Sequence, residues 1–232
     1  TASRFKNSHV TAVDLCLSSL SYAIRKTKEY GVTNIDYIQA DILDLEFLDK
    51  QFDIVESVGV LHHMNDPLLG WKVLESCLKP GGLMKIGLYG EVARKHIIKA
   101  RDFISNQNIG TSHKEMVGFR EHIKRSADPT LIPLKGEPDF YSTSTFRDLV
   151  FHVQEHRYTT EKLQDLLDSH GLTFCGFMVP EQIKKIYQER YPADSDMTSL
   201  TNWGKIDEEH PLGPVSPYGQ SKLMVENILL NS

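Results

Sequence analysis

The chain has 232 residues, of which 40% are apolar and 25% charged, a balance typical of folded globular proteins that excludes wholesale disorder and a fibrous repeat. Its formal net charge of −5 gives no bulk attraction to nucleic acid or to an anionic membrane, and no apolar run approaches the ~18 residues of a membrane span. Cys16, Cys77 and Cys175 lie far apart with no CxxC pair, which argues against a disulfide scaffold or zinc ribbon and favours buried, reduced thiols in a cytoplasmic protein.

The first part of the chain, residues 1–90, alternates strand and helix signals. Apolar, β-branched runs predict strands, and amphipathic stretches between them predict helices; the strands are 9–15, 35–41, 52–58 and 83–90, and the helices are 17–31, with Ser18 or Ser19 as N-cap, and 67–78, after Asp66-Pro67. A turn, Leu-Lys-Pro-Gly-Gly at 78–82, precedes the last strand. Near-continuous apolar strands with short links are typical of a parallel sheet covered by helices, so the predicted fold class is doubly wound α/β.

The rest of the chain is more polar. Residues 91–135 predict helices whose many basic residues, Arg94 among them, form a solvated face. An amphipathic helix over 160–170, capped by Thr160, and a strand over 172–179 follow, and a last helix is predicted over 219–230. We therefore expect an α/β core in 1–90, an accessory and substrate region with closing strands in 91–204, and a helical tail in 205–232.

Two acidic residues close successive predicted strands. In nucleotide-binding α/β sheets, ligands bind beyond the carboxyl ends of the strands. Asp14 stands where an acid can accept hydrogen bonds from both ribose hydroxyls, and Asp41 where a polar group can meet an adenine amino group. Acids after strands also serve as helix caps, so each residue has a purely structural alternative.

Four segments together resemble class I S-adenosylmethionine-dependent methyltransferases in order and spacing. They are VTAVDL (10–15), YIQADILDL (37–45), QFDIVESVGVLHHMNDP (51–67) and LKPGGLMKIGLYG (78–90). Residues 139–203 are similar to the carboxy-terminal part of large bacterial methyltransferases that often follow tetratricopeptide repeats. The resemblance implies a Rossmann-like fold and methyl transfer from S-adenosylmethionine to an unidentified acceptor, with a protein side chain as one option, in a larger tetratricopeptide-containing chain.

The resemblance also implies roles for individual residues. Those that would hold the cofactor are Asp14 at the ribose, Leu15 on the adenine, Asp41 and Ile42 at its rim, and Ser57, Val58 and Gly59 under the methionine end. His62 and His63 would face the methyl-transfer cleft, where either could act as a base. The alternative is that these histidines only pack or form local hydrogen bonds.

One part of the family pattern is missing. A first strand and its glycine-rich loop should precede the ribose acid by roughly 20 residues, yet only 13 residues stand before Asp14 and none of them is glycine. We expect the chain to begin inside the domain, as an amino-terminally truncated fragment whose sheet lacks its first strand. Such a chain should bind S-adenosylmethionine weakly, and micromolar affinity in isothermal titration would contradict this.

Residues 205–229 resemble a segment of UDP-glucose 4-epimerase. Tyr218 and Lys222 form the YxxxK pair in which lysine lowers the tyrosine pKa so that the phenolate can act as a base. No glycine-rich nucleotide fingerprint accompanies the pair, so we expect a non-functional tail joined near 208–211 by natural fusion or by an assembly artefact. The second functional hypothesis for the chain as a whole is a non-catalytic remnant that serves only as an interaction or structural module. The third is an NAD-dependent sugar-nucleotide epimerase fragment.

The segment His152-x-x-Glu155-His156 matches the HxxEH pattern of some zinc peptidases, in which two histidines stand one helical turn apart. Such a site needs a further ligand, and the best candidate is Glu226, 70 residues beyond His156 in the epimerase-like tail. We therefore expect no metal. The remaining interpretations are that His152, Glu155 and His156 line the acceptor side of the methyltransferase cleft, or that they belong to a packed helix with a polar edge.

Overall fold

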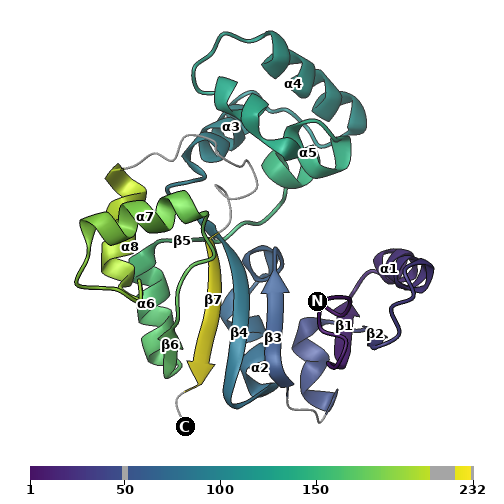
Figure 1. Ribbon diagram of the computed structural model, residues 1–232. Coiled ribbons are helices and arrows are strands. Elements are labelled where there is room, and N and C mark those ends of the chain that lie inside the picture. Colours follow the sequence, from purple (N-terminus) through teal and green to yellow (C-terminus); the bar gives the residue numbers. More distant parts are fainter. Residues whose placement is uncertain (49–51, 210–222, 231–232) are drawn as a thin grey trace.

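The computed structural model describes residues 1–48, 52–209 and 223–230, which form a Rossmann-like α/β fold with a helical insertion (Figure 1). The strands are β1 (Val10–Asp14), β2 (Ile35–Gln39), β3 (Phe52–Val58), β4 (Leu78–Gly90), β5 (Arg157–Tyr158), β6 (Leu172–Phe174) and β7 (Leu223–Leu230). The α-helices are α1 (Leu17–Glu29), α2 (Pro67–Ser76), α3 (Lys95–Asn106), α4 (His113–Arg125), α5 (Thr143–Val150), α6 (Thr160–Ser169), α7 (Glu181–Arg190) and α8 (Leu200–Glu209). Short 3-10 helices are η1 (Ile42–Leu48), η2 (Leu61–His63), η3 (Ile132–Gly136) and η4 (Pro138–Phe140).

The described strands form two sheets. β1 and β2 pair in parallel as one sheet, and the other has the order β3-β4-β7-β6, with β3 parallel to β4 and β7 antiparallel to both of its neighbours. β5 adds a short parallel pairing at the carboxyl end of β4. The predicted α/β class is confirmed, and the parallel pairs β1-β2 and β3-β4 lie in residues 1–90, where strands were predicted.

The helix predicted over 219–230 is wrong, because residues 223–230 form strand β7. The backbone of β7 pairs with β4 on one side and with β6 on the other, and so satisfies two strand edges that would otherwise leave backbone donors and acceptors unpaired. Pairing along two edges outweighs the local preference of the sequence. The predicted epimerase-like pair, Tyr218 and Lys222, lies outside the described residues.

The residues that cap the helices differ in part from those that the sequence indicated. α2 begins at Pro67 as predicted, and Asp66 is its N-cap, with a carboxylate that accepts hydrogen bonds from two backbone amides. At α1, however, the N-cap is Cys16 rather than Ser18 or Ser19, and at α6 the hydroxyl of Thr159 accepts from the Lys162 amide, one residue before the predicted cap. A serine or threonine can act as N-cap only where its own backbone is still extended, as that of Thr159 is, and the sequence does not fix that position to one residue.

Two strands also differ in extent from the prediction. β4 begins at Leu78, with a register irregularity against β3, instead of after a Pro-Gly-Gly turn. β6 ends at Phe174 instead of continuing to residue 179, since Gly176 adopts a φ of +139°, which is incompatible with a regular strand.

The described side chains pack into two cores. The first joins the β3-β4 sheet to α2, α6, α7 and α8, with Trp71, Ile86 and Leu167 almost fully buried. The second lies within the helical insertion, at the top of Figure 1, where α3, α4 and α5 bury residues such as Ile123 and Phe146. The helices predicted in 91–135 are therefore amphipathic, and Arg94, expected on a solvated face, is only 1% exposed.

The thiols differ from one another in burial. Cys77 is buried, which raises the pKa of its thiol, but Cys16 is exposed, so the expectation of uniformly buried thiols is wrong for that residue. Among the helices of the described ranges, none combines the length and the apolar character needed to cross a membrane.

Candidate functional site

The carboxyl ends of β1 and β2 present the two acids identified in the sequence. Asp14 is the last residue of β1 and is exposed; its Oδ1 accepts a hydrogen bond from the Cys16 amide at 2.7 Å. Asp41 follows β2, and its Oδ1 accepts from the Leu43 amide at 3.0 Å. The Gln39 side chain donates to the Leu15 carbonyl at 3.1 Å and so ties these two strand ends together. Both acids brace their own turns at the carboxyl ends of β1 and β2.

The apolar residues beside these acids differ in exposure. The Leu15 side chain is 66% exposed, so it is available to cover a flat ring, whereas Ile42 is half-buried at the start of η1. An exposed leucine next to an exposed carboxylate offers an apolar and a polar group side by side at the end of β1.

The carboxyl end of β3 carries Ser57, Val58 and Gly59. Ser57 is buried, and its Oγ has no hydrogen-bond partner among the described residues. Gly59 adopts a φ of +81°, a conformation that favours glycine and turns the chain away from the strand. A buried hydroxyl without a partner is costly, so a group bound at this strand end would satisfy it.

After Gly59 the chain forms η2, which contains both candidate histidines. His62 is fully buried, with its ring 3.7 Å from that of Tyr89 in β4. His63 is only partly buried, and its ring lies 3.8 Å from that of His152. Of the two, His63 is therefore the one with access to solvent.

The protonation of His63 follows from its surroundings. Its Nδ1 lies 3.1 Å from the backbone carbonyl oxygen of Gln154. A carbonyl oxygen only accepts, so Nδ1 carries the proton and Nε2 keeps its lone pair. Burial lowers the pKa of His63, which keeps the ring neutral near pH 7. His63 thus has the form that a general base requires.

The predicted HxxEH segment is not a helix. α5 ends at Val150, and residues 152–156 form a loop before β5. This loop, which we call the latch loop (152–156), lies against η2, where the His156 amide donates to the His62 carbonyl at 2.8 Å. Because this segment is irregular loop and not helix, the two histidines of the motif do not have the one-turn spacing of a zinc helix. Among the described residues no group of three or more histidine, cysteine, aspartate or glutamate side chains is arranged to hold a metal ion.

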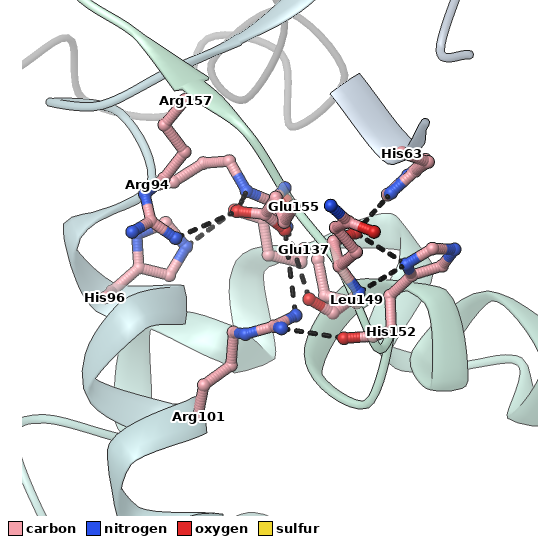
Figure 2. A network of polar contacts seen from close by, with 10 residues as sticks. His63, Arg94, His96, Arg101, Glu137, Leu149, His152, Glu155 and Arg157 are labelled. Carbon is pink, nitrogen blue, oxygen red and sulfur yellow. Dashed lines mark hydrogen bonds and ion pairs between the residues drawn. The ribbon is translucent and has the colours of Figure 1, made fainter. Parts of the chain in front are cut away.

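Glu155 lies at the centre of a buried cluster of charges (Figure 2). Its side chain is 0% exposed, and Arg94 binds both carboxylate oxygens, from Nε to Oε1 at 2.8 Å and from Nη2 to Oε2 at 2.5 Å. Arg101 and Arg157 lie at 3.8 and 3.6 Å from the same carboxylate. A two-pronged arginine contact is the strongest arrangement available to a buried carboxylate.

The sequence missed the residues that complete this region. Tyr89 lies between the ring of His62 and the guanidinium of Arg94, which is 3.7 Å from the tyrosine ring centre, and burial raises the pKa of its hydroxyl. Gln154 contacts His63 of η2 through its backbone carbonyl and Asn65, just after η2, through its side chain. An isolated arginine in a basic stretch gives no signal of burial, because its partner stands 61 residues away.

Comparisons with known proteins point to one family for the first part of the chain. Residues 1–86 match the family model described as a methyltransferase domain. An uncharacterised protein of Synechococcus sp. is 29% identical over 184 residues, which cover 74% of this chain and 43% of that protein. The ubiquinone/menaquinone biosynthesis C-methyltransferase UbiE of Bdellovibrio bacteriovorus is 31% identical over 83 residues, 36% of this chain and 35% of that enzyme.

Among solved structures, PKMT2 from Rickettsia typhi in complex with AdoHcy superposes over 100% of this chain with a TM-score of 0.65 and 14% identity. This similarity confirms the Rossmann-like fold. The match covers 46% of that chain, so the present chain spans less than half the length of each of these three relatives.

Proposed function

We propose that this chain is part of a class I S-adenosylmethionine-dependent methyltransferase and that its described residues form one wall of the methyl-transfer site. The observation that carries the proposal is the match of residues 1–86 to the methyltransferase domain, together with candidate residues at the carboxyl ends of β1, β2 and β3, each of which has a parallel neighbour in its own sheet. Bound S-adenosylmethionine would supply an electrophilic methyl group on its sulfonium.

The residues at the strand ends fit this cofactor. Asp14 offers an exposed carboxylate that can accept from ribose hydroxyls, with Leu15 exposed beside it. The unpartnered Oγ of Ser57 fits a polar ligand at the end of β3. Asp41 and Ile42 would border the adenine, and Val58 and Gly59 would run beneath the methionine portion.

On the acceptor side, His63 would act as the base. Its Nε2 lone pair can take a proton from an acceptor oxygen or nitrogen as that atom attacks the methyl group. The Gln154 carbonyl fixes the tautomer by holding the proton on Nδ1. His62, buried against Tyr89, would orient the turn without contacting the acceptor.

The proposal is tested by titrating the ¹⁵N-labelled chain with S-adenosylmethionine and following amide shifts by NMR, a method that detects weak binding. We expect the largest changes near Asp14, Asp41 and Gly59. Asp14→Asn should weaken binding by about tenfold, since an uncharged amide makes a poorer acceptor for two hydroxyls. Asp36→Asn is the matched control, because Asp36 is an exposed β2 residue paired with His9. Absence of shift changes at the three strand ends would contradict the proposal.

For the acceptor, we propose a protein side chain. Support comes from the apolar side chain of Val153, which is 97% exposed at the tip of the latch loop and can contact a large partner. Incubation of a cell extract with methyl-tritiated S-adenosylmethionine and the chain should place label in acid-precipitated protein. Label confined to the organic extract would instead indicate a lipid or small-molecule acceptor.

A further inference from the structure

The latch loop contacts η2 and the turn just after it through four separate interactions. The His156 amide donates to the His62 carbonyl at 2.8 Å, and the Gln154 carbonyl accepts from Nδ1 of His63 at 3.1 Å. The Gln154 side chain donates to the Asn65 carbonyl at 3.3 Å. The rings of His152 and His63 lie 3.8 Å apart. The position and tautomer of His63 therefore depend on where this loop lies.

The latch loop has no helix or strand of its own to hold it in place. Arginines from the insertion hold it instead. Arg94 binds both oxygens of Glu155 and also donates from Nη2 to the Leu149 carbonyl at 3.2 Å. Arg101 donates to the His152 carbonyl at 2.7 Å. In Figure 2, Arg94 and Arg101 lie on one side of Glu155 and His63 lies on the other.

Glu155 itself faces away from solvent. Its side chain is 0% exposed and that of Arg94 is 1% exposed, so neither group reaches an acceptor directly. A buried carboxylate between three arginines is held far more firmly than an exposed ion pair, since removal of one partner leaves an uncompensated buried charge. The cluster thus has the properties of an anchor for the latch loop.

We propose that Glu155 is a positioning residue: its anchorage by Arg94 holds the latch loop against η2 and thereby places His63 for proton transfer. The inference rests on the proposed function only in assigning proton transfer to His63. The placement itself is a property of the chain without cofactor or acceptor. Arg94 acts as the second positioning residue, because its fork binds the carboxylate and the end of α5 together.

The test compares Glu155→Gln with Glu181→Gln by amide hydrogen exchange of the full chain. Glu181 is the matched control, because its ion pair with Lys184 lies on an exposed helix face where such pairs contribute little. In Glu155→Gln the His156 amide should exchange on the order of 100-fold faster, as expected when a buried pair is broken. The amide of Leu167, in the first core, should keep its rate in both variants.

A second readout is the ¹⁵N shift of the His63 ring. In the parent chain Nδ1 should carry the proton, whereas in Glu155→Gln the two tautomers should mix once the Gln154 carbonyl moves away. Should Glu155→Gln fail to fold, the double variant Arg94→Met with Glu155→Leu keeps an apolar pair of similar size, a replacement that buried ion pairs often tolerate. In this variant too, the His156 amide should exchange faster and the two tautomers of His63 should mix.

Three results would overturn the proposal: an unchanged His156 amide in a folded variant, equal acceleration of exchange throughout the chain, or loss of folding in both variants. The last two would make Glu155 a residue of general stability only. None of these readouts needs cofactor, so failure here leaves the methyltransferase proposal standing, and failure of the S-adenosylmethionine titration leaves this one standing.

Discussion

At the scale of single residues, the partial burial of His63 makes the stability of the folded chain depend on pH. Burial holds the pKa of His63 below its ordinary value of 6.5, so the folded chain resists protonating this ring. The unfolded chain has no such resistance and binds the proton more readily. The contribution of His63 to stability is therefore greatest above pH 6.5 and is lost as the pH falls through that value.

We expect His63→Gln to reduce the loss of stability on acidification. The measurement is urea unfolding of both chains at several values between about pH 5 and pH 7, followed by circular dichroism. The difference between the two chains isolates His63 from the other histidines. A parent chain whose stability falls no more steeply than that of the variant would show that His63 is not desolvated.

At the scale of elements, the contact between β3 and β4 depends on a glycine beside the site. A Cβ at Gly87 would lie 2.7 Å from Cγ1 of Val58 and 3.1 Å from its Cα. Since backbone cannot yield as a flexible side chain does, Gly87→Ala must push the end of β3 away from β4. We expect a loss of about 1–3 kcal/mol in the free energy of unfolding, typical of an overpacked interior.

The matched control for this prediction is Gly118→Ala. Gly118 is an exposed residue within α4, and a Cβ there meets nothing within 4 Å. Alanine should therefore stabilise the chain by about 0.5–1 kcal/mol through its helix propensity. Chemical denaturation of both variants checks the pair, and a neutral Gly87→Ala would mean that β3 is free to shift.

At the scale of the whole molecule, the described side chains form two hydrophobic cores, and no described residue is buried in both. The insertion that contains α3, α4 and α5 leaves the sheet after β4 and returns at β5, and the Arg94–Glu155 pair joins the two ends of this excursion. We infer that the insertion can lose structure locally while the sheet stays folded.

Phe146→Ala tests this organisation, because Phe146 is fully buried in the second core. The substitution should cost about 3–5 kcal/mol and accelerate amide exchange in α3, α4 and α5 while leaving α6 protected. Leu167→Ala, in the first core, should give the reverse pattern. Uniform acceleration in both variants would show that the cores unfold as one unit.

The sequence by itself determined the local features of this protein. The apolar strands of residues 1–90, the start of α2 after Asp66-Pro67 and the acids that end β1 and β2 could all be predicted, because each depends on neighbours a few residues away. The resemblance of the same residues to methyltransferases agrees with their match to the methyltransferase domain. The predicted roles of the site residues stay predictions.

The tertiary structure alone decided what depends on distant partners. Residues 223–230 became a strand because two edges of a sheet needed pairing, although their sequence context indicated a helix. Arg94 and Glu155 are 61 residues apart, and only the fold shows that a basic side chain expected in solvent is buried on a carboxylate. Burial and pairing are properties of position in space, so the anchor of the latch loop could not be read from the order of the residues.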